Sequence, residues 1–139
     1  MVYGTDVFFA VIGCPALERS GDVSMAEVMG FIHLYGDARM TVFGVLGLIA
    51  AATLVFTTGL GSVASGWAVL AVAGLGLQLG VYLTVARPVN AALKAAAQQN
   101  ITPADARALQ RRWDRVIGLR SLGCVLAVAG LTLVALSLP

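Results

Sequence analysis

Long uncharged stretches recur along this chain and are separated by shorter polar segments. No charged residue occurs from Met40 to Gly59 or from Gly66 to Ala86, and Val116 to Leu138 is apolar apart from Arg120. A helix needs roughly 20 apolar residues to cross about 30 Å of hydrocarbon at about 1.5 Å per residue. The pattern therefore predicts three membrane-spanning helices.

A shorter apolar stretch from Val2 to Leu17 contains Asp6. A secretory signal peptide would begin with basic residues, and the first 18 residues contain no Lys or Arg. We therefore expect a fourth transmembrane helix here, the alternative being a re-entrant or partly buried segment. The expected fold is all-α, with residues 1–139 forming one domain, an antiparallel bundle of four transmembrane helices.

Two of the predicted spans extend into polar flanking sequence. Hydrophobic residues recur at helical spacing between Met25 and Tyr35, which predicts an amphipathic helix leading into the second span. Thr102 and Pro103, followed by Asp105, are typical of a helix start. We therefore expect one long fourth helix from about Pro103 to Leu138, with its first turns extended into the cytoplasm.

Composition narrows the class of protein further. The chain is 59% hydrophobic and 12% charged, with a mean hydropathy of +0.90. Globular proteins are about 45–50% apolar and about 25% charged. These values exclude a disordered protein, a nucleic-acid-binding module and an ordinary cytosolic enzyme, so we expect the lipid bilayer, and no nucleic acid, as a partner.

The net charge of +2 says little, but the distribution of the charges is informative. Eight basic residues fall in the loops before the second and fourth spans: Arg19, Arg39, Arg87, Lys94, Arg107, Arg111, Arg112 and Arg115. None falls at the predicted opposite side. The positive-inside rule then makes these loops cytoplasmic and both termini external, in a cell membrane protein.

A stripe of small residues runs along the third span at Ala73, Gly76, Gly80 and Thr84. Small residues let transmembrane helices approach closely. The stripe predicts either packing in the bundle interior or a homodimer contact.

Three residues with a charged or amide side chain lie inside predicted spans, where ionisable groups cost at least about 2.5–3.5 kcal/mol. They are Asp6, Gln78 and Arg120. Asp6 is either an exposed residue near a frayed helix end or a pocket carboxylate, and Gln78 suits an interhelical hydrogen bond. Arg120 either extends to the inner surface or pairs with an acid at the inner side or with an anionic ligand.

A second polar set lies at the inner boundary. His33 and Asp37 are four residues apart, so they share a helix face and could hydrogen-bond, either as a surface pair or as a general base with its orienting carboxylate. One His and two Cys give no metal-site spacing. A haem on His33 is conceivable but unsupported, so we expect no cofactor.

Three segments together resemble the anthrone-oxygenase-like family of small four-helix membrane proteins. They are GTDVFFAVIGCPAL, ARPVNAAL and RRWDRVIGLRSL. The resemblance singles out Pro15, Asn90, Trp113 and Arg120 as pocket residues. It implies oxidation of an anthrone to an anthraquinone by molecular oxygen, without a metal or flavin.

The implied reaction assigns roles to the polar residues. His33 or Asp6 would act as the base, and Arg120 would stabilise the resulting anion. Asn90 would hold a carbonyl oxygen and Trp113 would stack on a flat ring, while Gln78, Tyr82 and Asp37 complete the expected substrate pocket. The expected function is a cofactor-independent oxygenase or oxidase of a lipophilic aromatic compound. The alternatives are a protein that binds or transports a hydrophobic small molecule, and a structural subunit of a membrane complex.

Overall fold

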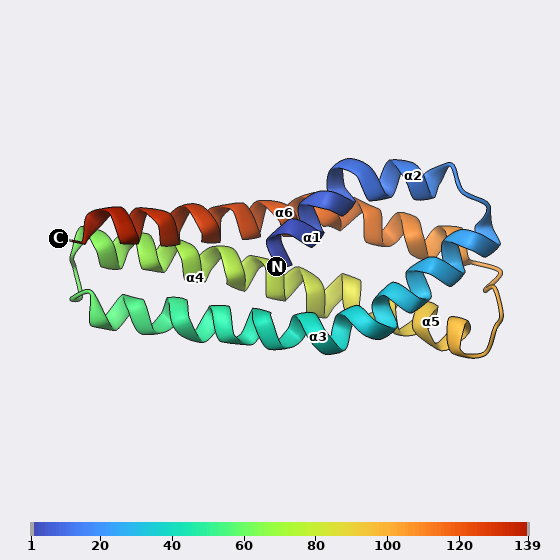
Figure 1. Cartoon of the computed structure of the whole chain (residues 1–139), viewed down its shortest axis with the longest axis horizontal. Coiled ribbons are helices and arrows are strands. Elements are labelled where there is room, and N and C mark those ends of the chain that lie inside the picture. The colour runs from blue at the N-terminus through green and yellow to red at the C-terminus, as the bar shows by residue number, and fades with distance from the viewer. Residues whose placement is uncertain (1, 139) are drawn as a thin grey trace.

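The computed structural model describes residues 2–138, and within them every regular element is a helix. The elements are α1 (Val2–Phe8), the π-helical segment η1 (Phe9–Gly13), α2 (Cys14–Glu18), α3 (Asp22–Thr57), α4 (Val63–Val81), the π-helical segment η2 (Tyr82–Ala86), α5 (Arg87–Gln98) and α6 (Ala106–Ser137). The all-α prediction is confirmed. Figure 1 shows the helices lying alongside one another in an elongated molecule.

Three helical segments are long and apolar enough to cross a membrane. They are Asp22–Thr57, Val63–Gln98 and Ala106–Ser137, and they contain the three predicted spans apart from one or two residues at the ends of the first and third. The segments α1, η1 and α2 follow one another without a break and are not among the three. In Figure 1, α1 begins about halfway along the molecule, so this first helix covers only one half of the others. A crossing by the first helix stays a prediction.

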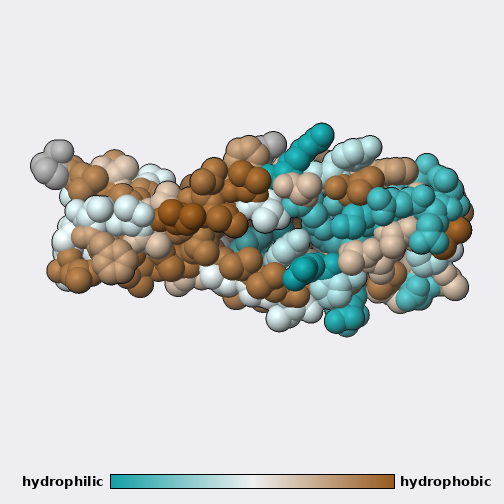
Figure 2. All heavy atoms as spheres, turned by 90° about the horizontal axis from the view of Figure 1, so that it is seen from below, coloured by the Kyte–Doolittle hydropathy of each residue, from teal (hydrophilic) through white to brown (hydrophobic). Residues whose placement is uncertain are grey.

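Polar and apolar residues separate along the long axis. In Figure 2, apolar residues gather over the left half of the molecule, which holds the α3–α4 connection and the end of α6 in Figure 1. Polar residues gather over the right half, where α2, α5 and the beginnings of α3 and α6 lie. Since α3 and α6 have 36 and 32 residues, each is about 50 Å long and exceeds the hydrocarbon core. The long helices therefore carry their flanking polar turns beyond the apolar half, as predicted for α6.

Small residues bring α4 and α6 into backbone contact. A Cβ atom added at Gly74 would lie 2.4 Å from the carbonyl oxygen of Gly123, and one added at Gly130 would lie 2.7 Å from the carbonyl oxygen of Trp67. The predicted stripe at Ala73, Gly76, Gly80 and Thr84 is instead exposed. Its expected role in the bundle interior is wrong, because the interior face of α4 is displaced from it, and the homodimer contact stays a prediction.

Each π-helical segment ends directly before a proline-containing turn. Pro15 and Pro88 lack a backbone N–H, and their rings would clash with the carbonyl group four residues earlier in a regular α-helix. The helix widens instead, and the N–H of Cys14 donates to the carbonyl of Phe9, five residues earlier. The N–H of Arg87 donates in the same way to the carbonyl of Tyr82. Both widened turns border the cavity described below, as π-bulges at functional sites often do.

The polar half has an apolar core of its own. Met25, Met29 and Leu93 are fully buried there, and Trp113 packs with them. Arg107 on α6 fixes the α2–α3 turn to this core. Its guanidinium donates to the carbonyl oxygens of Leu17 (2.9 Å) and Ser20 (2.7 Å) and to the carboxylate of Asp22. These contacts hold the first helix against α6.

Candidate functional site

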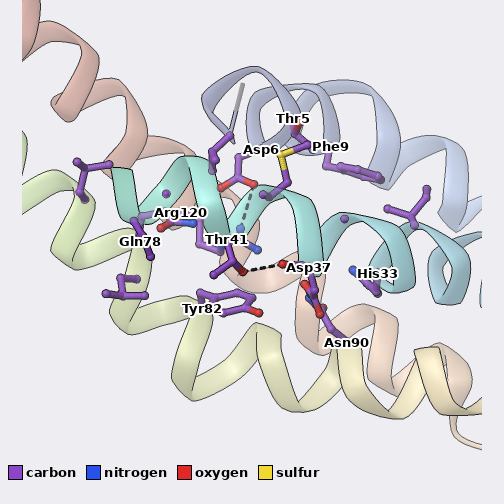
Figure 3. A pocket seen from close by; sticks show the side chains of 18 of the residues that line it. Thr5, Asp6, Phe9, His33, Asp37, Thr41, Gln78, Tyr82, Asn90 and Arg120 are labelled. Atoms are coloured by element: carbon purple, nitrogen blue, oxygen red, sulfur yellow. Dashed lines mark hydrogen bonds and ion pairs between the residues drawn. The ribbon is translucent and has the colours of Figure 1, made fainter. Parts of the chain in front are cut away.

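One cavity of about 150 Å³ lies between the first helix and the three long ones. Figure 3 shows polar side chains from α1, α3, α4, η2, α5 and α6 converging on it. Eight of the nine residues predicted to form the site line it: Asp6, His33, Asp37, Gln78, Tyr82, Asn90, Trp113 and Arg120. The ninth, Pro15, is exposed and does not line the cavity, because its ring acts on the helix backbone before it. Apolar residues complete the walls.

Asp6 and Arg120 form a buried ion pair inside the cavity wall. Arg120 Nη2 donates to Asp6 Oδ1 at 3.1 Å, and the two side chains are 9% and 5% exposed, respectively. The guanidinium also lies over the ring of Tyr82, with its carbon 5.7 Å from the ring centre. The carboxylate of Asp6 therefore lies in the cavity wall, and Arg120 pairs with this carboxylate on α1, which is not the inner-side acid that was expected.

Asp37 pairs with Asn90 across the cavity. Asn90 Nδ2 donates to Asp37 Oδ1 at 2.9 Å, which joins the middle of α3 to the start of α5. The expected His33–Asp37 hydrogen bond is not formed among the described residues. Although the two residues share a helix face, the Asp37 carboxylate accepts a hydrogen bond from the Asn90 amide instead, and the His33 imidazole packs near Trp113 of α6.

Three aromatic rings pack together in the cavity wall. The ring of Trp113 lies edge to face with that of Phe9, with centroids 5.3 Å apart, and 5.8 Å from that of His33. Phe9 begins η1, so the widened turn before Pro15 sets its position. The ring planes meet at 81° for Phe9 and Trp113 and at 53° for His33 and Trp113, and together the rings form an aromatic wall beside the polar groups.

Several buried polar atoms of the cavity have no hydrogen-bond partner within residues 2–138. They are Asp6 Oδ2, His33 Nε2, Asn90 Oδ1, Trp113 Nε1 and Arg120 Nε. Buried polar groups are nearly always hydrogen-bonded, and leaving one unpaired costs about 1–3 kcal/mol. This concentration of unpaired donors and acceptors suits a cavity that receives a polar group of a ligand or ordered water.

Gln78 and Tyr82 lie one helical turn apart on the cavity side of α4 and η2 (Figure 3). Gln78 is half-buried and lines the cavity together with Asp6. The hydrogen bond expected for Gln78 to another helix is not among the contacts of the described residues. Within those residues, no group of three or more His, Cys, Asp or Glu side chains is placed to hold a metal ion.

Sequence reasoning missed the apolar and small residues of the site. Besides Phe9, these include Gly36, Met40, Thr41 and Gly44, which continue the face of α3 that begins at His33. Their three- and four-residue spacing from His33 is the signal that could have revealed them.

Comparison with known proteins gives a match to a protein family. No protein of curated function and no solved structure matches the chain. The family model described as "Anthrone oxygenase" matches residues 31–130, a range that holds all the site residues except those of the first helix. The match covers more than half of the chain. The protein therefore belongs to the anthrone oxygenase family.

Proposed function

We propose that this protein is a membrane-embedded oxygenase that uses molecular oxygen to oxidise a flat, lipophilic aromatic compound bearing a phenol or carbonyl oxygen. The convergence of His33, Asn90 and Arg120, each with an unpaired buried polar atom, beside the aromatic wall carries the proposal. Family membership supports the same class of substrate.

The position of the site suits a substrate that arrives through the bilayer. From the α3–α4 end of the molecule, Gln78 and Arg120 lie at a depth of about 22 and 26 Å along their helices. Asp37 lies at about 30 Å and His33 at about 36 Å along α3. With the apolar half in a hydrocarbon core about 30 Å thick, the polar end of the cavity meets the membrane boundary. A lipophilic compound can then enter sideways while its oxygen atoms meet the polar groups.

The chemistry begins with removal of a proton from the acidic carbon or phenol of the substrate. The neutral imidazole of His33 has an unpaired Nε2 and can accept this proton. Arg120 then stabilises the negative charge that develops on the substrate oxygen, and Asn90 and Trp113 orient the ring. Asp6 keeps the Arg120 side chain in position through the ion pair.

Oxygen transfer balances for an anthrone. The anion gives one electron to O₂, the two radicals combine into a peroxide anion, and protonated His33 returns its proton to give the hydroperoxide. Neutral His33 then removes the second hydrogen of that carbon as a proton while the O–O bond breaks, which yields the quinone carbonyl and hydroxide. The hydroxide takes the proton from His33 and leaves as water. One oxygen atom enters the product, and the imidazole is again neutral.

The membrane arrangement that goes with this proposal has four antiparallel spans in the cell membrane. The basic loops face the cytoplasm and both termini face outward, because the basic residues gather at one end of the helices. A homodimer through Ala73, Gly76, Gly80 and Thr84 fits the exposure of this stripe to lipid.

Oxygen uptake tests the proposed function. The purified protein in nanodiscs is mixed with an anthrone, and O₂ consumption is compared with that of empty nanodiscs. Replacing His33 with Gln removes the base at similar size and should lower kcat about 10²- to 10⁴-fold. Thr53→Val is the matched control, since Thr53 lies exposed on the same helix and outside the cavity.

Three outcomes would overturn the proposal or a part of it. Uptake equal to that of empty nanodiscs, together with stoichiometric retention of the aromatic compound, would indicate a binding or transport protein. Equal rates for the His33→Gln and Thr53→Val variants would remove His33 as the base. Loss of a larger membrane complex in a Gly80→Ile variant, with no aromatic compound bound by the parent protein, would indicate a structural subunit.

A further inference from the structure

The cavity continues past its polar end as an apolar groove between α3 and α4. Gly44, Val45 and Leu48 form its α3 side and face Leu75 and Leu79 of α4. These five residues, here called the tail groove, carry no polar side-chain atom. Val45 and Leu79 are about half and one-third exposed, respectively, so the groove is open to the surrounding lipid along one side.

The groove makes the cavity longer than a ring system requires. From His33 to Leu48 the cavity follows about 22 Å of α3, about twice the length of a fused three-ring compound. Leu48 lies about 14 Å from the end of α3, which is near the middle of a 30 Å hydrocarbon core. The groove therefore runs from the membrane boundary into the depth that acyl chains occupy.

A glycine keeps this groove open. A Cβ atom added at Gly44 would meet no atom within 4 Å, although Gly44 lines the cavity, so the space beside it is free. Gly36, two turns earlier on the same face, has the same property. Gly47 also has free space around a built Cβ, but it does not line the cavity. Gly44 is thus the position at which a larger side chain would divide the cavity into two.

We propose that the substrate carries a hydrocarbon chain: it is an alkyl- or isoprenyl-substituted phenol or hydroquinone whose chain lies in the tail groove. The inference rests on the proposed function, because it assumes that the aromatic head binds beside His33, Asn90 and Trp113. The tail groove is apolar, continuous with the polar head site, open to lipid and directed into the bilayer. It therefore matches an amphiphile with a polar aromatic head and one hydrocarbon chain. Gly44 then determines specificity by leaving room for the chain.

Photo-crosslinking tests where the chain lies. The probe is a hydroquinone with a saturated chain that ends in a diazirine, added to the protein in nanodiscs and mapped by mass spectrometry. We expect labelling at Leu48 and Leu75, reduced by an excess of the same hydroquinone without the diazirine. Labelling of Leu46 and Ile49, on the exposed face of the same helix, would show a chain lying in bulk lipid and would overturn the proposal.

A pair of variants separates the chain from the head. Gly44→Leu should lower labelling at Leu48 and Leu75 about tenfold, because the added side chain overfills the groove. It should leave quenching of tryptophan fluorescence by an unsubstituted hydroquinone unchanged. Gly47→Leu makes the same chemical change outside the cavity and should alter neither signal. Equal labelling in the two variants would refute the role of Gly44.

The readouts also separate this inference from the proposed function. Specific labelling in the groove without oxygen uptake would leave the chain-binding inference in place and remove the oxygenase. Oxidation of an anthrone with no specific labelling in the groove would support the oxygenase and overturn the chain-binding inference. Groove labelling that an excess of phospholipid abolishes would assign the groove to an acyl chain of the bilayer and overturn the proposed substrate class.

Discussion

Breaking the Asp6–Arg120 ion pair should lower the free energy of unfolding much more than breaking an ordinary surface ion pair does. The two side chains are 5% and 9% exposed, and the paired atoms are 3.1 Å apart. Removing one member of a buried pair costs about 3–5 kcal/mol because the other charge is left uncompensated. Exposed pairs contribute only about 0.2–1 kcal/mol. The pair is also the direct polar link between α1 and α6.

The two single variants should differ in how much they destabilise the protein. In Asp6→Leu, the Arg120 guanidinium keeps its contact with the Tyr82 ring, and such a contact contributes up to about 2 kcal/mol when desolvated. The cost should therefore lie near the lower limit, about 3 kcal/mol, or roughly a hundredfold in the unfolding constant. In Arg120→Met, Asp6 loses its cation, and its Oδ2 has no partner within residues 2–138. We therefore expect a loss of about 4–5 kcal/mol in the free energy of unfolding.

The double variant gives the decisive measurement. Asp6→Leu with Arg120→Met removes both charges, and replacing a whole buried pair with apolar residues is often close to neutral. Its cost should be at least about 3 kcal/mol less than the sum of the single costs. Reversible unfolding in bicelles, followed by steric trapping, gives the free energies. Additive single costs below about 1 kcal/mol would show that water reaches the pair and would refute its burial.

Two further predictions concern how the helices are held together. Gly74→Ile and Gly123→Ile should each lower the melting temperature sharply or prevent folding, because both positions lie in backbone contact between α4 and α6. Gly76→Ile is the control and should change the melting temperature little, since no atom lies within 4 Å of a Cβ built there. Equal melting temperatures for all three variants in a thermal-shift assay would contradict the packing. Arg107→Ala should destabilise the protein by about 1–3 kcal/mol in the bicelle unfolding assay, because it loses charged hydrogen bonds to two carbonyl groups and a carboxylate. Arg111→Ala, on the exposed surface of α6, should cost less than about 0.5 kcal/mol. An equal cost for the two variants would show that Arg107 does not hold the α2–α3 turn.

Local sequence patterns were sufficient for most of the helices. The three long apolar helices follow from runs of about 20 uncharged residues, and the extension of α6 follows from its start signals near Asp105. The interruptions at η1 and η2 were not predicted, although Pro15 and Pro88 mark them. A proline inside an apolar helix can kink it, end it or widen one turn, and the neighbouring helices decide among these outcomes.

Eight of the nine residues singled out from polarity and family resemblance line one cavity, and Pro15 does not. Their pairing was not predictable. Asp6 meets Arg120 across 114 residues, and Asn90 meets Asp37 across 53, so neither pair follows from spacing on one helix. The sequence therefore determined which segments are helical and which polar residues would lie among them. Only the tertiary structure decided which helix faces meet, because in a bilayer the close fit of small residues such as Gly74 and Gly123, rather than hydrophobicity, selects the contact.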